Sequence, residues 1–198
     1  GDSTKDGIDR TYSLVRGFNA PSPEAKLEKG FNLHHLEVKL SAEVDPYFKG
    51  WAIVAAREEA AELEEAVIQS TCLPYGFQLK AGKFFSDLGR LNSQHAHAWD
   101  FADQPLAYRL LLGGHNLNDK GAQISWLAPT SFHLLAGLEA FQGDNLSSFN
   151  YLGDNGLPQK DGPRLWVSWL KLAPNLPAKH GLQLGASLAS GVHQTALD

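Results

Sequence analysis

The sequence predicts an all-β protein built as an antiparallel, up-and-down arrangement of strands. The clearest sign is the segment 36–44, Leu-Glu-Val-Lys-Leu-Ser-Ala-Glu-Val, in which apolar or small residues alternate with polar ones. Side chains alternate between the two faces of a strand, so this segment has one apolar face and one charged face. Similar alternation recurs along the chain, and short turn motifs separate the segments that carry it.

Residues 1–30 are predicted to be an N-terminal extension, and residues 31–198 to form one domain of strands and loops. One predicted strand begins at residue 62. The glutamate-rich stretch at its start has helical propensity, but Val67, Ile68 and Thr71 favour a strand over a helix. The predicted strands are a short one at 11–18 and clearer ones at 32–44, 48–57, 62–72, 77–83, 121–127, 132–142, 164–172 and 181–190.

The connections between these strands alternate in length. Short turns are predicted at 45–47, 73–76, 128–131 and 173–180, and longer or more charged connections at 58–61, 86–120 and 143–163. In an up-and-down arrangement all the short turns lie at one end of the strands and all the others lie at the opposite end. This asymmetry is typical of outer-membrane β-barrels.

Composition excludes several classes of protein. The net charge of -5 offers no basic surface for nucleic acid. No run of about 18 apolar residues is present, which excludes a membrane helix but leaves a membrane barrel open, because barrel strands are short and alternating. The single cysteine, Cys72, excludes an internal disulfide and a cysteine-based zinc site. No serine, histidine and aspartate stand at a spacing that suggests a catalytic triad, so no enzymatic activity is expected.

Residues 73–105 resemble a family of porin-like outer-membrane β-barrels of diderm bacteria. The most specific part is 82–105, Gly-Lys-Phe-Phe-Ser-Asp-Leu-Gly-Arg-Leu-Asn-Ser-Gln-His-Ala-His-Ala-Trp-Asp-Phe-Ala-Asp-Gln-Pro. Further similar segments are 44–50, 121–129 and 138–143. Members of the family are often loosely labelled zinc-regulated TonB-dependent outer membrane receptors. The resemblance implies a transmembrane β-barrel in the bacterial outer membrane, with the lipid bilayer as its surroundings.

Two departures from this family predict an incomplete barrel. Its members are usually considerably longer, and outer-membrane barrels normally end on a strand with a terminal aromatic residue, whereas this chain ends Thr-Ala-Leu-Asp. We therefore expect the N-terminal part of a larger barrel, incomplete at its C-terminus. A partner chain, or further copies in a homo-oligomer, could complete it.

The long connection 86–120 is the best candidate for a functional site, because a connection of this length is usually functional or disordered. We expect it to fold into or over the lumen and narrow the pore, where charged side chains act as a filter. The alternative is an outer loop that only packs the barrel mouth. The candidate constriction residues are Arg90, His95, His97, Trp99, Asp100, Asp103 and Arg109.

Within this connection, His95, His97 and Asp100 could bind a divalent metal such as zinc, since imidazole and carboxylate groups suit that ion. The alternative is a hydrated loop without a cofactor. Polar residues opposite the apolar strand faces are predicted to line the lumen; in a soluble sandwich they would face water. These residues are Glu37, Lys39, Ser41, Glu43, Gln78, Lys80, Gln123, Ser125, Gln183 and Ser187.

The function that these patterns favour is a porin-like channel for passive passage of small hydrophilic solutes or ions. Three alternatives stay open. The protein could be an outer-membrane metal-uptake or receptor protein that uses the His/Asp loop. It could be a soluble or periplasmic β-sandwich binding module. It could also be a structural barrel subunit of an outer-membrane complex.

Overall fold

The computed structural model describes residues 36–56, 61–101, 104–113, 116–144, 149, 162–177 and 180–191. The structured elements are mostly strands, with a short helix and two 3-10 turns between them. The strands are β1 (Leu36–Asp45), β2 (Phe48–Ala56), β3 (Ala61–Ser70), β4 (Phe77–Phe85), β5 (Asn118–Leu127), β6 (His133–Phe141), β7 (Leu165–Ala173) and β8 (Leu184–Gly191). The helical elements are η2 (Pro74–Gly76), η3 (Ala96–Ala98) and α1 (Leu106–Leu112).

The chain divides into two compact units. One comprises Gly1–Glu37 and Ala55–Glu62, and the structure describes only a few of its residues, at the ends of β1, β2 and β3. The other comprises Val38–Val54 and Leu63–Asp198. This larger unit contains every contact discussed below.

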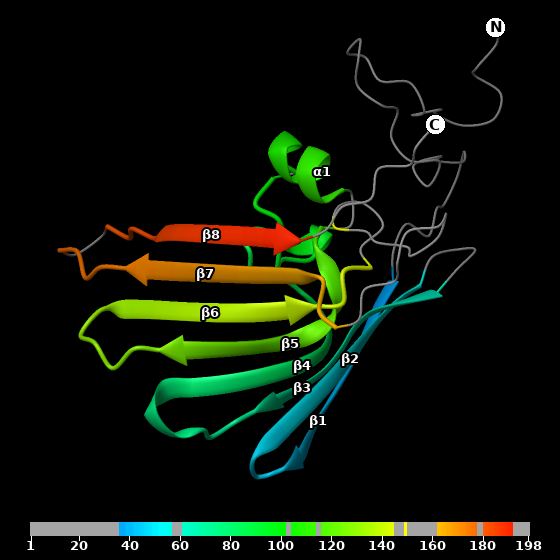
Figure 1. The fold of residues 1–198 in the computed structure, drawn as a ribbon, viewed down its shortest axis with the longest axis horizontal. Helices are drawn as coiled ribbons and strands as arrows, with labels where there is room; N and C mark the ends of the chain where they lie inside the picture. Colours follow the sequence, from blue (N-terminus) through cyan, green and yellow to red (C-terminus); the bar gives the residue numbers. More distant parts are fainter. Residues whose placement is uncertain are drawn as a thin grey trace, which may run out of the picture. The chain divides into compact units, whose positions relative to one another are not determined.

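The strands form one eight-stranded sheet in the order β1-β2-β3-β4-β5-β6-β7-β8 (Figure 1). From β3 onward each strand runs antiparallel to the next, with Gly82 opposite Gly121 and Glu139 opposite Val167. The predicted all-β, antiparallel, up-and-down arrangement is therefore confirmed. In the described part of the chain β1 and β8 are the two edge strands of this sheet.

The predicted strands from 32–44 onward agree with the observed ones to within a few residues, and the observed β5 begins earlier, at Asn118. The predicted strand at 11–18 lies outside the described residues. Because neighbouring strands are antiparallel, the short β1–β2, β3–β4, β5–β6 and β7–β8 connections all lie at one end of the strands, as the sequence predicts. Figure 1 shows the hairpins of β5–β6 and β7–β8 side by side at that end.

Helix α1 lies within the connection between β4 and β5 and was not predicted from the sequence. The helix follows Pro105 and ends at Gly113, whose φ of 77° suits a residue without a side chain. Its seven residues make only about two turns, too few to leave a clear helical period in the sequence. Among the residues that the structure describes, no helix is long and apolar enough to cross a membrane.

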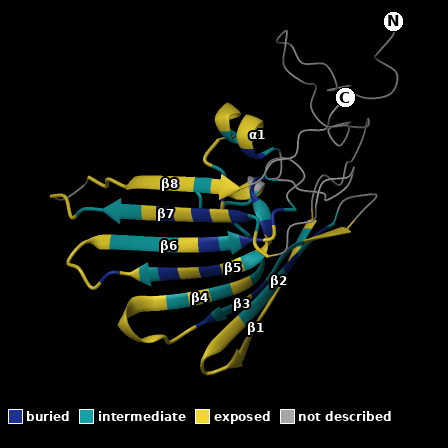
Figure 2. Cartoon of the chain, viewed as in Figure 1, coloured by how far each residue is buried: buried dark blue, intermediate teal, exposed yellow. Residues whose placement is uncertain are grey.

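The two faces of the sheet differ in composition. On one face, apolar side chains are exposed on several strands, such as Ile124, Leu138 and Leu170. On the other face, the alternate residues of β5, β6 and β7 are buried, and Figure 2 shows buried and exposed residues interleaved along these strands. This second face also holds polar groups, which include Gln123 and Glu139. We call the two the apolar face and the mixed face.

The hydrophobic core lies on the mixed face, near the end at which the long connections leave the strands. The rings of Phe84 and Phe141 lie 5.0 Å apart, and Leu117 from the β4–β5 connection is fully buried in the same cluster. Trp169 packs directly over Gly137, where an added Cβ would come within 2.2 Å of the indole ring. The mixed face therefore carries both a closely packed hydrophobic cluster and the polar residues that were predicted to lie opposite the apolar face.

Candidate functional site

The connection between β4 and β5 begins by running across the mixed face of the sheet. The hydroxyl of Ser86 donates a hydrogen bond to Glu139 on β6, and the backbone N–H of Asp87 donates to the same carboxylate at 2.9 Å. Further along, the backbone N–H of Gly89 donates to the hydroxyl oxygen of Ser187 on β8 at 2.9 Å. Residues 86–89, which we call the crossing segment, leave β4 and are hydrogen-bonded to β6 and β8. Neither of these strands is a neighbour of β4 in the sheet.

The side chain of Asp87 is the centre of a polar cluster on this face. Its Oδ1 lies 3.0 Å from the ammonium of Lys171 on β7, and its Oδ2 lies 3.4 Å from the ammonium of Lys80 on β4. The side-chain amide of Gln123 on β5 donates to Oδ2 at 3.0 Å. Burial alone would raise the pKa of Asp87, but the charges of Lys80 and Lys171, with the hydrogen bonds from Lys171 and Gln123, outweigh it and lower this pKa below its ordinary value.

Aromatic rings hold both lysines in place. The ammonium of Lys80 lies 4.3 Å from the ring centroid of Phe84, and that of Lys171 lies 4.8 Å from the ring of Trp169. Each lysine side chain is only 15% exposed. Ammonium groups over aromatic faces gain electrostatic attraction, which grows as water is excluded. The two cations are thus fixed on neighbouring parts of the sheet instead of extending into solvent.

Glu139 is fully buried, and its carboxylate oxygens accept hydrogen bonds from neutral donors. Besides Ser86 and Asp87, the indole N–H of Trp169 donates to its Oε1 at 3.0 Å. A buried carboxyl group is tolerated when such donors satisfy its oxygens. Glu139 therefore joins β6, β7 and the crossing segment at one point.

Asn92 links the two ends of the connection between β4 and β5 by hydrogen bonds. Its amide nitrogen donates to the carbonyl oxygens of Ser86 and Leu117, at 2.8 and 2.9 Å, and its Oδ1 accepts the N–H of Leu117 at 2.7 Å. Asn92 is fully buried. A single side chain thereby satisfies the backbone groups where the connection leaves β4 and where it enters β5.

A second polar cluster surrounds His95. Its Nδ1 lies 3.0 Å from a carboxylate oxygen of Glu64, and its Nε2 lies 3.1 Å from Glu65, both on β3. The indole N–H of Trp51 donates to the other oxygen of Glu65 at 2.5 Å. These three ionisable side chains are 12–14% exposed. Glu64 and Glu65 approach opposite nitrogens of the ring, so a divalent metal ion on His95 would share it with only one of them; Nδ1 with Glu64 is an imidazole–carboxylate pair of the kind that suits such an ion.

The sequence grouped His95 with His97 and Asp100 as metal ligands. The two imidazole rings do lie near each other, with centroids 5.7 Å apart. Asp100 instead pairs with Arg90, at 3.3 Å, and both side chains are mostly exposed. The two carboxylates that flank His95 come from Glu64 and Glu65, which the sequence suggested only as part of an acidic stretch. Their role depends on the packing of the connection against β3, which no local pattern encodes.

The other predicted constriction residues are dispersed. The indole of Trp99 donates to the backbone of Gln94 at 3.1 Å, and Arg109 is exposed on α1. Asp103 lies outside the described residues. The residues that converge on the mixed face are instead Asp87 and its partners. Of these, the sequence singled out Lys80 and Gln123, whereas Asp87, Lys171 and Glu139 carried no recognisable motif.

The residues predicted to line a lumen lie on more than one part of the mixed face. Lys39, Ser41 and Glu43 line a shallow hollow on β1 and β2 together with Lys49 and Trp51. On β4, β5 and β8, the residues predicted to line the lumen are partly occupied in contacts within the chain. Gln78 donates to the carbonyl of Ser70 at 3.4 Å, Ser125 is buried, and Ser187 accepts the hydrogen bond from the crossing segment. Gln183 is exposed, and Glu37 belongs to the smaller unit.

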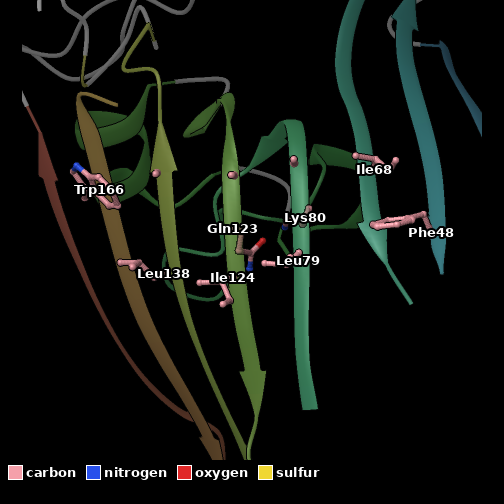
Figure 3. A pocket seen from close by; sticks show the side chains of 11 residues that line it. Phe48, Ile68, Leu79, Lys80, Gln123, Ile124, Leu138 and Trp166 are labelled. Atoms are coloured by element: carbon pink, nitrogen blue, oxygen red, sulfur yellow. The ribbon is translucent and has the colours of Figure 1, made fainter. Parts of the chain in front are cut away.

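The apolar face carries an open groove that spans several strands. Figure 3 shows the side chains that line it, from Phe48 and Ile68 on one side to Leu138 and Trp166 on the other. Leu79 and Ile124 lie between them, and all six side chains are exposed. Nothing in the described part of the chain covers this groove.

Comparison with known proteins gives one informative match. No family model matches the chain, and no solved structure matches it. A protein of Aquifex aeolicus (strain VF5), described as an uncharacterized protein, is 46% identical over 153 residues. The match covers 75% of this chain but only 32% of that protein. The chain therefore spans about a third of the length of this relative.

Proposed function

We propose that this chain is part of an outer-membrane β-barrel through which small hydrophilic solutes or ions pass. The observation that carries the proposal is the exposed apolar face. Ile124, Leu138 and Trp166, on three successive strands, are each 42–47% exposed and are continuous with other exposed apolar residues. Water-soluble monomers rarely expose an apolar patch of this kind. The lipid-facing side of a barrel consists of such residues.

The mixed face supports the second half of the proposal, a polar passage. Its ionisable groups, such as Lys39, Glu43, Lys80 and Lys171, lie on the side of the sheet opposite the exposed leucines and isoleucines. In a barrel this side faces the lumen. The crossing segment would then lie inside the barrel wall and narrow the passage, and the charges around Asp87 would act on passing ions because screening by bulk water is weak there.

The edge strands require further pairing under this proposal. A strand edge exposed to lipid leaves backbone groups without partners, at several kcal/mol each. We propose that further strands, from the same polypeptide or from another chain, pair with β1 and β8. The Aquifex relative supports this view, since 68% of its length lies beyond the match.

The test is to fold the protein into detergent, insert it into a planar bilayer and record single-channel currents with ion selectivity. Discrete conductance steps are expected. A protein that stays monodisperse in water without detergent, and does not insert, would overturn the proposal and favour a soluble β-sandwich. A correctly inserted but silent barrel would instead favour a structural role in an outer-membrane complex.

A second candidate function, metal uptake, is favoured by the pairing of His95 with Glu64. Two carboxylates on one strand approach both nitrogens of a single imidazole, at 3.0 and 3.1 Å. Zn²⁺ binding there would place a metal site on the long connection. The zinc titration described in the Discussion tests this candidate separately from conductance.

A further inference from the structure

We infer that Lys80, Gln123 and Lys171 form a binding site for small carboxylate anions, and that Asp87 occupies this site as an internal ligand. The site is defined by geometry alone and does not depend on how the protein is used. Its consequence for transport rests on the proposed function, because it names small carboxylates as the solute class that the passage would favour.

The three side chains surround the carboxylate of Asp87 with hydrogen-bond donors, which is the arrangement that a bound carboxylate anion requires. They come from three different strands, β4, β5 and β7, and converge on one group. Lys171 contacts Oδ1 of Asp87 at 3.0 Å, whereas Lys80 and Gln123 contact Oδ2 at 3.4 and 3.0 Å. Both oxygens therefore have cationic or amide donors. Charge-assisted contacts of this kind are the strong ones in anion recognition.

The site is built into the fold. Gln123 is 5% exposed, and each lysine is held over an aromatic ring with 15% of its side chain exposed. Within the described residues, both lysines form their ion pairs with Asp87. The nearby carboxylate of Glu139 receives hydrogen bonds from Ser86, Asp87 and Trp169 instead. Without the side chain of Asp87, the two ammonium groups would have no carboxylate between them.

Gln123 contacts the carboxylate through its amide N–H, and its side-chain carbonyl oxygen takes no part in anion binding. This Oε1 atom is buried and has no hydrogen-bond partner in the described structure. A buried acceptor without a donor is uncommon and carries a desolvation penalty. A carboxylate has no hydrogen to donate to this oxygen, so the anion site consists of the amide N–H of Gln123 and the two ammonium groups.

The attachment of Asp87 allows its side chain to be exchanged for another carboxylate. Its backbone is held separately, because its N–H donates to Glu139 at 2.9 Å while its carboxylate contacts the lysines. Asp87 also lies in a connection and not in a strand, so no ladder hydrogen bond depends on its side chain. A solute anion would compete with an intramolecular ligand of the same chemistry.

Chemical rescue tests this inference. Asp87→Ala removes the carboxylate and leaves the β-carbon, which vacates a space for formate. We expect the variant to unfold at a lower urea concentration than the wild type in detergent micelles, and sodium formate to restore the lost stability. At a formate concentration about ten times its dissociation constant, the unfolding equilibrium constant should fall about elevenfold, because it varies as 1 + [L]/Kd. Sodium chloride at equal ionic strength is the reference.

Two variants serve as controls. Asp100→Ala removes an exposed carboxylate from the same connection, where it pairs with Arg90, and should give no specific response to formate. The double variant Asp87→Ala, Lys171→Gln should lose the response. If Asp87→Ala does not fold, Asp87→Ser, which keeps a small polar side chain, takes its place in the same titration.

The inference is overturned if formate does not stabilise the folded variant, or if it stabilises Asp87→Ala and Asp100→Ala equally. The titration needs no conductance, so it separates the two proposals. Rescue in a protein that forms no channel would leave the anion site standing and remove the transport role. A conducting protein without rescue would remove the anion site alone.

Discussion

The backbone N–H of Asp87 donates to Oε1 of Glu139 at 2.9 Å, which fixes the β4–β5 connection to a strand 52 residues further along the chain. The same oxygen accepts the indole N–H of Trp169 on β7 at 3.0 Å. One fully buried carboxylate therefore joins two strands and a connection. Together with Ser187 and the lysines that contact Asp87, this group holds the crossing segment on the mixed face.

Replacing Glu139 by alanine should destabilise the protein strongly. The change leaves the hydroxyl of Ser86, the N–H of Asp87 and the indole of Trp169 without their acceptor, and buried donors without partners cost about 1–3 kcal/mol each. Partial relaxation and water entry reduce the sum, so we expect a loss of about 2–4 kcal/mol in the free energy of unfolding. Urea unfolding in detergent micelles, followed by circular dichroism, measures it.

The matched control is Glu43→Ala, which removes an exposed glutamate from β1. Surface substitutions of this kind usually change stability by less than about 0.5 kcal/mol. Equal losses in the two variants would contradict the anchoring role of Glu139.

A methyl group at Gly137 should also destabilise the sheet. Its Cβ would lie 2.2 Å from the ring of Trp169, so the indole would have to move. Overpacking of this kind typically costs about 1–3 kcal/mol. The comparison is Gly185→Ala on β8, whose nearest contact would be an ordinary 3.5 Å. Thermal unfolding of both variants is the measurement, and similar midpoints would show that Trp169 does not pack over Gly137.

The stability of the protein should fall in acid in a way that depends on Asp87. Its pKa in the folded protein is below the ordinary value of 3.8 because Lys80 and Lys171 outweigh the effect of burial. The folded state therefore binds the proton less tightly than the unfolded state. This contribution is fully present above the unfolded pKa and is lost as the pH falls through the folded pKa.

Urea midpoints measured between about pH 6 and pH 2 test this dependence, since that range includes the ordinary carboxyl pKa. The Asp87→Asn variant should be less stable near neutral pH and should lose less stability on acidification than the wild type. Parallel curves for the two proteins would show that Asp87 contributes no linkage.

The apolar face gives the clearest test of a lipid environment. Ile124→Arg places a charge among exposed apolar side chains. If this face contacts lipid, the substitution should reduce folding stability in phosphatidylcholine vesicles by about 2–4 kcal/mol near the bilayer midplane. If the face contacts water, the change should be within about 0.5 kcal/mol, because Ile124 is exposed. The control is Ser41→Arg, which places the charge on the mixed face, at β1. This substitution should be tolerated in either case.

A zinc titration tests the cluster around His95. If Zn²⁺ binds there, isothermal calorimetry should give a saturable signal that His95→Ala abolishes. Glu64→Gln should weaken it, because that carboxylate lies 3.0 Å from Nδ1 of the imidazole. His133→Ala is the control, since His133 lies on β6 with an exposed side chain. An unchanged signal in His95→Ala would exclude this cluster as the binding site.

The strands were predictable because their signal is local. Alternation with a period of two residues marks both the strand and its two faces, which is why Lys39, Lys80 and Gln123 were placed on the face opposite the exposed apolar residues. Turn residues such as Pro74 and Gly76 marked the hairpin ends in the same way. The antiparallel order then followed from the short connections.

The centre of the candidate site was not predictable, because its contacts are non-local. Asp87 is an ordinary loop aspartate in the sequence, and only the register of the strands from β4 to β7 brings Lys80, Gln123 and Lys171 around it. The same holds for Glu64 and Glu65, which belong to a glutamate-rich stretch in the sequence and gain a defined contact only because the connection places His95 against them. Sequence periodicity identifies faces, but it does not show which loop covers them.

The packing of Trp169 gives the protein a natural optical reporter. Its indole N–H is bonded to Glu139, its ring lies beside the ammonium of Lys171, and both of these groups also contact Asp87. Indole emission is sensitive to nearby charge and hydrogen bonding, so displacement of Asp87 should change the fluorescence of this tryptophan. Replacing the other four tryptophans with phenylalanine would leave a single-tryptophan protein, in which movement of the crossing segment could be followed in real time without an attached dye.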